Sequence, residues 1–130
     1  MFDLNNFKLV NDKYGHDIGN LVLKEVSNKI IEFVRSYNDT YTIRLGGDEF
    51  LIFIKDNLSD DNIKLELTKL NKLLTKWDTP IDDVNLSSSI GAYRYLPKSI
   101  SDIDKLLKIV DELLYKAKNN GKNTFVYKSI

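Results

Sequence analysis

The sequence predicts an α+β domain of the ferredoxin-like kind, in which helices pack on a mostly antiparallel β-sheet. Strand-type and helix-type runs follow one another in the order β-α-α-β-β-α-β-α-β. Two of the strand runs flank Gly46-Gly47, as in an antiparallel hairpin. The 130 residues, of which 42% are hydrophobic and 29% charged, suit a single globular domain with one core.

The first third of the chain reads as a short strand and two helices. The sequence begins with a short apolar strand. Phe7 and Val10 follow at helical spacing, and Gly15 is expected to end a short helix. Asp17 is the expected N-cap of a longer helix that ends near Tyr37. The apolar positions of this helix recur every three or four residues and are Ile18, Leu21, Val22, Val26, Ile30, Phe33 and Val34.

A β-hairpin and a third helix follow. Residues 40–54 predict the hairpin, because β-branched and apolar runs lie on either side of the two glycines. The next helix has acidic residues early and lysines late, which is the order that the helix dipole favours. Its apolar face comprises Ile63, Leu67, Leu70 and Leu74.

The last third is expected to hold a strand, a helix and a final short strand at 124–128. The first of these covers about residues 84–95, where Gly91 indicates a bulge or a close approach of another backbone. Ser101 is expected to cap the helix, and Gly121 to end it. The apolar face of this helix comprises Ile103, Leu106, Leu107, Val110, Leu113 and Leu114.

Composition excludes several classes of function. Lysine and arginine together equal aspartate and glutamate at 19 each, which argues against bulk electrostatic binding to nucleic acid or anionic lipid, so any phosphate site must be local. Without cysteine there are no disulfides, thiolate metal sites or cysteine nucleophiles, and a cytoplasmic setting is allowed. The longest apolar run is far short of the roughly 20 residues that cross a bilayer, so we expect a soluble domain with no membrane segment in this chain.

Two aspartates are the strongest candidates for chemistry. Asp3 lies where a short strand gives way to a helix, and Asp48 lies at the hairpin turn, with Glu49 beside it. Taken alone, each aspartate is more commonly a helix cap or a solvated turn residue. If their strands are neighbours in the sheet, the two carboxylates and the free carbonyl of Leu4 become oxygen ligands suited to Mg²⁺ that is shared with substrate phosphates.

The sequence signals for residues that would contact a nucleotide are less specific. Phe7 and Lys8 would supply backbone N–H groups and one ammonium from the start of the first helix. Lys118 and Lys122, read as one helical turn apart, could add positive charge, although a solvated helix face is the commoner role of a single lysine.

Three further polar residues have equally ordinary alternatives. His16 is the only histidine, and next to a glycine it is more often a turn or capping residue than a general base. Asn11 and Asn20 could present amide groups to the edge of a base, but surface polar positions are the default for both.

Four stretches of the chain stand out as long motifs: DLNNFKLVNDKYGHDIGN, RLGGDEF, SSIGAY and DELLYKAKNNGKN. Together and in this order they resemble the GGDEF domain of diguanylate cyclases, from residue 3 to about residue 125. The resemblance implies a palm-like sheet, related to that of adenylate cyclases and polymerases, and an activity that condenses two GTP molecules into cyclic di-GMP. It also implies that two domains, each with one GTP, must face each other for turnover.

The resemblance assigns a role to each candidate residue. Asp3, the Leu4 carbonyl and Asp48 would hold Mg²⁺ or Mn²⁺, and Asp48 would also accept the 3′-hydroxyl proton. Glu49 would be the second acid of the signature. The residues that would read guanine or line the nucleotide pocket are Asn11, Asn20 and His16, and those that would surround the phosphates are Phe7, Lys8, Gly46, Gly47, Lys118 and Lys122.

The chain departs from the family pattern at several positions. Asn20 stands where the family usually has Asp, so one contact with guanine becomes donor against donor, and we expect weaker or less selective guanine binding. Thr40 and Tyr37 stand where the product-inhibition motif would have Asp and Arg, so feedback inhibition there is not expected. Lys122 replaces a more usual Arg and loses the planar fork that binds phosphate bidentately.

Only Met1 and Phe2 precede Asp3, whereas family members carry a helix and most of a central strand there. We therefore expect the N-terminal strand to be truncated, sheet edges to be exposed, and the whole protein to have a sensory or regulatory domain upstream. Two interpretations remain open. The first is a diguanylate cyclase, and the alternative is a degenerate, non-catalytic module that binds GTP or cyclic di-GMP and signals through partners.

Overall fold

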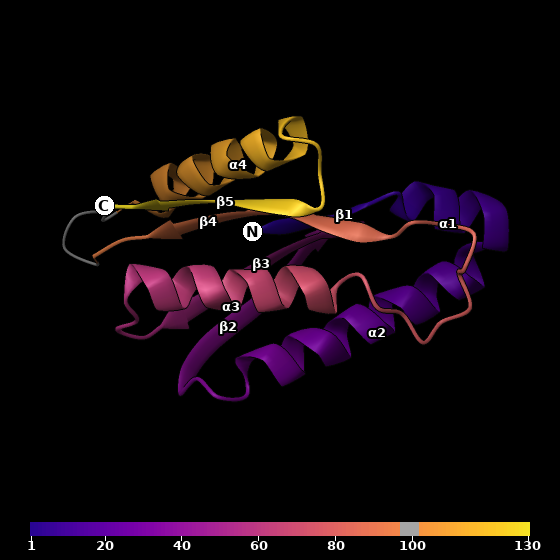
Figure 1. Ribbon diagram of the computed structural model, residues 1–130, viewed down its shortest axis with the longest axis horizontal. Helices are drawn as coiled ribbons and strands as arrows, with labels where there is room; N and C mark the ends of the chain where they lie inside the picture. Colours follow the sequence, from indigo (N-terminus) through magenta and orange to yellow (C-terminus); the bar gives the residue numbers. More distant parts are fainter. Residues whose placement is uncertain (97–101) are drawn as a thin grey trace.

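The computed structural model of the protein describes residues 1–96 and 102–130 and confirms the predicted α+β fold (Figure 1). Ser101, the expected cap of the last helix, lies outside the described residues. The nine elements are β1 (Phe2–Asn5), α1 (Phe7–Tyr14), α2 (His16–Val34), β2 (Asp39–Gly46), β3 (Glu49–Lys55), α3 (Asp60–Leu73), β4 (Ser87–Arg94), α4 (Ile103–Asn119) and β5 (Thr124–Ser129).

The five strands form one mixed sheet in the order β2-β3-β1-β4-β5. All neighbouring strands are antiparallel except β4 and β5, which are parallel because α4 connects them. The first strand is therefore central, and its Asp3 lies opposite Glu49 of β3 on one side and Ser89 of β4 on the other. Hydrogen bonding on both sides makes β1 a firm support for Asp3.

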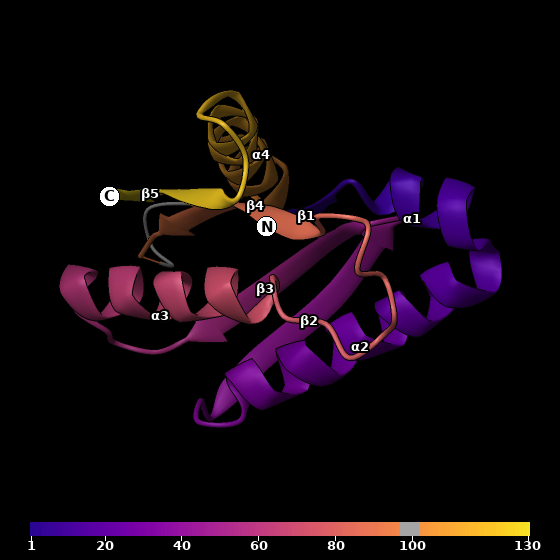
Figure 2. The ribbon, with the colours of Figure 1, turned by 45° about the vertical axis from the view of Figure 1, so that its right-hand side comes forward.

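Helices cover the two faces of the sheet differently. The views show α4 on one face, and α2 and α3 on the other (Figures 1 and 2). Side chains alternate along a strand, so Phe2 and Leu4 of β1 enter the core beneath α2 and α3, while Asp3 faces α4. Phe2 stacks on Phe50 with ring centroids 5.0 Å apart, which joins β1 to β3 within this core.

The predicted hairpin and the predicted close approach at one glycine are both confirmed. β2 ends at Gly46 and β3 begins at Glu49, so the chain reverses at the two glycines. Gly91 allows α4 to lie directly on β4, because a Cβ atom there would be 2.3 Å from the backbone nitrogen of Leu114. Burial of Leu106, Leu114 and Ala117 explains why α4 seals this face.

Some predicted element ends were wrong. Asp17 does not cap α2, because the helix begins one residue earlier with Gly15 at the N-cap and no side-chain cap, and Asp17 lies in its first turn. That helix ends at Val34 rather than near Tyr37, and β4 begins at Ser87 rather than near Val84. These ends follow hydrogen bonding that apolar periodicity does not record.

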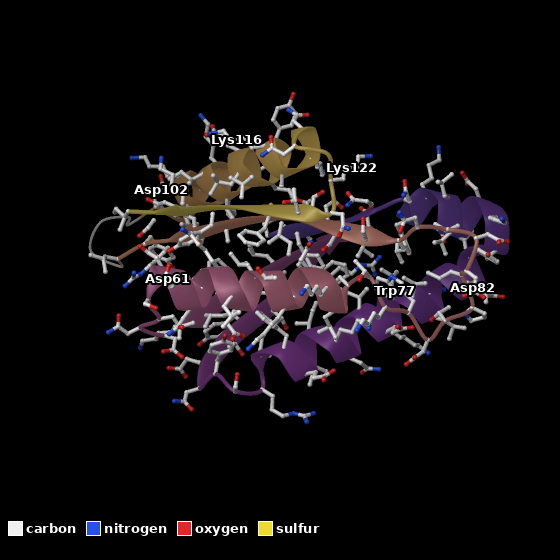
Figure 3. The ribbon with its side chains drawn as sticks, in the orientation of Figure 1. Asp61, Trp77, Asp82, Asp102, Lys116 and Lys122 are labelled. Carbon is white, nitrogen blue, oxygen red and sulfur yellow. The ribbon has the colours of Figure 1, made fainter. Side chains whose placement is uncertain are left out.

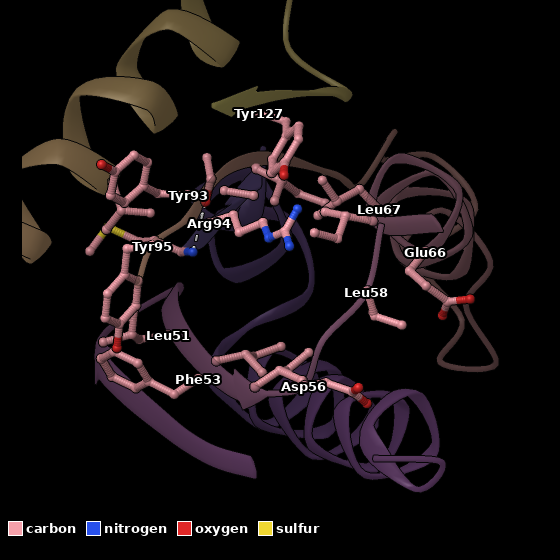
Figure 4. A pocket seen from close by; sticks show the side chains of 18 of the residues that line it. Leu51, Phe53, Asp56, Leu58, Glu66, Leu67, Tyr93, Arg94, Tyr95 and Tyr127 are labelled. Carbon is pink, nitrogen blue, oxygen red and sulfur yellow. Dashed lines mark hydrogen bonds between the residues drawn. The ribbon is translucent and has the colours of Figure 1, made fainter. Parts of the chain in front are cut away.

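A gap opens in the sheet beyond the start of β1. β1 pairs with β3 only as far as Phe50 and with β4 only as far as Ile90, where Met1 and Gly91 still exchange hydrogen bonds. Farther along, β3 and β4 have no partner on their facing edges among the described residues. A cavity of about 630 Å³ lies there, lined mainly by apolar and aromatic side chains such as Leu51, Phe53 and Tyr93 (Figure 4).

Candidate functional site

The two aspartates singled out in the sequence are brought together at one end of the sheet. Asp3 projects from β1 towards α4, and Asp48 lies in the turn that leads into the neighbouring strand β3. The backbone N–H of Leu4 donates to the Asp48 carbonyl at 3.1 Å, which fixes the turn against the central strand. The predicted convergence of these acids is therefore confirmed.

The electrostatics of the pair show how close the two carboxyl groups are. Partial burial, followed by the negative charge and hydrogen-bonding capacity of Asp3, raises the pKa of Asp48 above its usual value of 3.8. One Asp3 oxygen, Oδ1, is buried and has no hydrogen-bond partner in the described structure. A buried carboxylate oxygen without a donor beside a second acid is an arrangement that a cation would stabilise.

These residues fit a hard divalent cation. In a β-strand the N–H and C=O of one residue point to the same side, so the Leu4 carbonyl faces the turn as its N–H does. Two carboxylates and a carbonyl are an oxygen set that Mg²⁺ or Mn²⁺ accepts, with further positions left for water and phosphate. Among the described residues no group of three or more His, Cys, Asp or Glu side chains could hold a metal ion, so coordination here would combine the two carboxylates with backbone, water or phosphate oxygens.

Lys118 lies over the acidic cluster from the last turn of α4. Its ammonium pairs with Asp3 Oδ2, and the two side chains are 39% and 15% exposed. Although partial burial lowers the pKa of Lys118, its hydrogen bond to Asp3 and the charges of Asp3, Glu49 and Asp48 raise it above the usual 10.5. One ammonium faces three carboxylates, so the cluster keeps a surplus of negative charge that favours a further cation.

The prediction that Lys122 follows Lys118 by one helical turn was wrong. α4 ends at Asn119, and Lys122 lies in the following turn with a φ of 60° (Figure 3). Its side chain is exposed and makes no ion pair within the described residues. Lys118 and Lys122 thus approach the site from different elements, and only Lys118 contacts the acids.

The glycine turn is held by a residue that sequence reasoning missed. Arg44 of β2 donates from Nε to the carbonyl of Gly47 at 2.9 Å. Gly47 has a φ of 41°, a left-handed conformation that glycine adopts without strain. The only signal in the sequence was a basic residue three positions before the turn carbonyl, a spacing that gains meaning only once the hairpin register is known.

The start of α1 adds backbone donors next to Asp3. Helix α1 begins at Phe7 directly after Asn6, which makes no side-chain cap hydrogen bond. The first N–H groups of a helix have no partner inside the helix, so those of Phe7 and Lys8 remain available to an anion. The Phe7 ring is buried in the core and the Lys8 side chain is exposed, which leaves the backbone and one mobile ammonium for this role.

The remaining candidates lie around the junction of α1 and α2. Asn11 is half-buried on α1, whereas His16 and Asn20 are exposed at the start of α2. In the described structure none of the three side chains makes a hydrogen bond within the protein. Their polar groups are therefore free for a ligand, and the structure alone assigns them no further role.

Comparison with known proteins identifies the family. The family profile described as "Diguanylate cyclase, GGDEF domain" matches residues 1–124. The chain belongs to the GGDEF family. Structural similarity agrees: the GGDEF domain of YfiN from Pseudomonas aeruginosa has a TM-score of 0.81 at 24% identity, over 99% of this chain and 80% of that one. The palm-like fold expected from the motifs is therefore confirmed.

Two curated relatives match this chain over part of their own length. The biofilm architecture maintenance protein MbaA of Vibrio cholerae serotype O1 is 36% identical in an alignment 134 residues long, which covers 98% of this chain and 17% of MbaA. Diguanylate cyclase DosC of Escherichia coli is 34% identical in an alignment 131 residues long, which covers 95% of this chain and 26% of DosC. The GGDEF chain thus spans about a quarter or less of either relative.

Proposed function

We propose that this GGDEF domain condenses two GTP molecules into cyclic di-GMP and pyrophosphate. The single observation that carries the proposal is the Asp3–Asp48 pair beside the Gly46-Gly47 turn, with an unsatisfied buried oxygen and a raised pKa at its centre. Family membership and the diguanylate cyclase name of DosC support the same reaction. The proposed substrate is GTP, and the proposed cofactor is Mg²⁺ or Mn²⁺.

Each part of the site has a place in this reaction. Asp3, the Leu4 carbonyl and Asp48 hold the divalent ion, which when bound neutralises phosphate charge and stabilises the leaving pyrophosphate. The N–H groups of Phe7 and Lys8 bind phosphate oxygens at the positive end of α1. The glycine turn lets phosphate approach the backbone, because neither Gly46 nor Gly47 presents a side chain.

Asp48 is the proposed acceptor of the 3′-hydroxyl proton. The Asp48 carboxylate lies at the turn beside the proposed phosphate site, which is where a base for this step is needed. Glu49, at the first position of β3, adds a second negative charge to the same cluster. Lys118, which is paired with Asp3 in this structure, would be placed to contact the phosphates if a cation were bound to Asp3.

Base recognition is proposed for the α1–α2 junction. Asn11 and Asn20 present amide groups to the guanine edge, and His16 lines the same pocket. An amide offers both an acceptor and a donor, so it can pair with a base edge only in one orientation. A second GGDEF domain must supply the other GTP, because one such site holds one nucleotide.

Product formation from GTP tests the proposal. Purified protein is incubated with GTP and Mg²⁺, and cyclic di-GMP is quantified by chromatography over a range of protein concentrations. We expect a product whose rate rises faster than linearly with protein concentration, as a reaction between two domains requires. Asp48→Ala should abolish the product, whereas Asp82→Ala, an exposed aspartate on the loop before β4, should not.

A second candidate function is a binding module without turnover. The exposed amide of Asn20, in the place of a family carboxylate, favours this candidate because it weakens the expected contact with guanine. Saturable binding of GTP or cyclic di-GMP with no product at any protein concentration would select the module over the enzyme.

The domain is also proposed to extend on the N-terminal side of β1. β3 and β4 present unpaired edges to each other across the apolar cavity, and both edges continue the line of β1. An extended apolar segment in that position would pair with both strands and fill the cavity. The length of the relatives supports a longer protein, for which we propose a regulatory domain upstream and a cytoplasmic setting. None of the helices in the described part of the chain is long and apolar enough to span a bilayer.

A further inference from the structure

The junction between α1 and α2 contains a glycine inside a helix. Gly19 is buried in the first turns of α2, where alanine would be the better helix former. Its φ is not in the left-handed region, so the backbone does not require glycine at this position. The reason for glycine must therefore be the space that a side chain would fill.

That space is occupied by the side chain of Asn11. A Cβ atom on residue 19 would be 1.9 Å from Asn11 Oδ1 and 3.0 Å from Asn11 Cγ, far inside van der Waals contact. The third-nearest neighbour is the Phe7 ring at 3.6 Å, which is an ordinary contact. The Asn11 carboxamide thus lies against the bare backbone of α2, and any larger residue at 19 would displace it.

Packing against Gly19 is what orients Asn11. Within residues 1–96 and 102–130 the Asn11 carboxamide makes no hydrogen bond, so its orientation depends on steric contact. Gly19 is followed directly by Asn20, the second residue assigned to the base. The same helical turn therefore contacts the Asn11 carboxamide and carries Asn20.

We propose that Gly19 is a positioning residue for guanine recognition. Because Gly19 has no Cβ atom, the Asn11 carboxamide can lie against α2 in the position and orientation that meet the base edge. Gly19 thus contributes to the selection of GTP over ATP without contacting either nucleotide. This inference rests on the proposed function, in which Asn11 reads guanine. A base-edge contact depends on which face of the amide is presented, so a displacement of about 1 Å is enough to lose it.

A double-mutant cycle tests this role. Gly19→Ala, Asn11→Ala and the double variant are compared with the parent for Mg²⁺–GTP and Mg²⁺–ATP affinity by calorimetry, and for Tm. We expect Gly19→Ala to weaken GTP binding about tenfold and leave ATP binding unchanged. In the Asn11→Ala background the same substitution should have no effect on GTP binding and should raise Tm, because the clash is gone and alanine favours the helix.

The outcomes separate this inference from the proposed function. If Asn11→Ala weakens GTP binding but Gly19→Ala does not, the positioning role is wrong while base recognition by Asn11 stands. If Asn11→Ala leaves GTP binding unchanged, the base assignment fails and the positioning role fails with it. If Gly19→Ala alone does not fold, recovery of folding in the double variant supports the Gly19–Asn11 contact on which the positioning role depends. Failure of the double variant to fold would overturn that contact, and the positioning role with it.

Discussion

At the scale of single residues, the proposed cation site has a cost in stability. Without a bound metal ion, the neighbouring carboxyl groups of Asp3 and Asp48 destabilise the folded protein. Partial burial and the charge of Asp3 both disfavour ionised Asp48. Because the pKa of Asp48 in the folded state lies above 3.8, the unfolded chain releases this proton first. The folded state therefore loses stability as the pH rises from about 3.8 through the raised pKa.

Asp48→Asn should accordingly raise the Tm of the metal-free protein at neutral pH. Relief of the contact between like charges is worth roughly 0.2–1 kcal/mol, which corresponds to an increase of up to about 4 °C. The gain should shrink as the pH is lowered through the raised pKa, since wild-type Asp48 is then protonated. Calorimetric scans between pH 3 and pH 8 would measure it, and a Tm that falls at neutral pH would contradict the assignment.

Asn20 provides the second prediction at this scale. Asn20→Asp restores two acceptors for the N1–H and N2 amino donors of guanine, so GTP should bind between about 5-fold and 150-fold more tightly, with a greater preference over ATP. Asn28→Asp makes the same charge change at an exposed position farther along α2 and is the matched control. Equal effects of both substitutions would point to general electrostatics rather than base recognition.

The sequence predicted part of this site correctly, and the reasons differ by residue. Asp3 and Asp48 were placed together because each ends or begins a strand at a recognisable turn. Lys122 was misplaced because the end of α4 depends on local hydrogen bonding at Asn120 rather than on the apolar stripe. Arg44 was missed because its partner is a backbone carbonyl, which no residue type reveals.

At the scale of elements, the hairpin turn controls the site through its backbone. Gly47 has open space where a Cβ atom would stand but a φ of 41°, so a substitution there strains the backbone without a clash. The chain continues from Gly47 directly into Asp48. The conformation of this turn therefore sets where the Asp48 carboxylate lies relative to Asp3.

Gly47→Ala should destabilise the protein by about 1–2 kcal/mol and weaken divalent-cation binding, because alanine disfavours the left-handed region. Gly47→Asn should cost less on both measures, since asparagine visits that region more readily. Urea unfolding and cation titration of the two variants would compare them. A loss for asparagine as large as, or larger than, the loss for alanine would contradict the explanation from the left-handed backbone.

The order of helices and strands could be predicted from local sequence patterns, but the pairing of the strands in the sheet could not. The apolar stripes and the close approach at Gly91 are properties of short stretches, and the structure confirms them except at Leu21 and Ile103, which were expected on apolar helix faces and are exposed. The order β2-β3-β1-β4-β5 joins Phe2 with Phe50 and Ile90, which are far apart in the chain. No period within a single segment specifies such contacts, so the residues gave no strand pairing by themselves, and only the resemblance to the family implied a central strand before Asp3.

At the scale of the whole molecule, the fold has a gap between β3 and β4 beyond the start of β1. Leu51 and Phe53 of β3 face Tyr93 of β4 across a cavity of about 630 Å³ (Figure 4). Unpaired facing edges and apolar walls are both features that a further strand would satisfy. The stability of the chain should therefore depend on what is joined to β1.

An N-terminal extension of five residues with alternating valine and threonine should raise Tm by about 3–10 °C, from roughly 1–3 kcal/mol of net burial and strand pairing. A Gly-Ser extension of the same length is the control, since it has the same reach and no apolar side chains to bury. An equal Tm for the two extended proteins would show that the cavity does not accept a strand.

The claim on which the rest depends is that Asp3 and Asp48 share one divalent cation with bound GTP. Mn²⁺ binding measured by electron paramagnetic resonance, with and without GTP, tests it directly on the wild-type protein, Asp3→Asn and Asp48→Asn, with Asp82→Asn as the control. We expect GTP to strengthen Mn²⁺ binding to the wild-type and control proteins, and each site variant to lose at least tenfold in affinity. Unchanged Mn²⁺ affinity in both site variants would contradict the account.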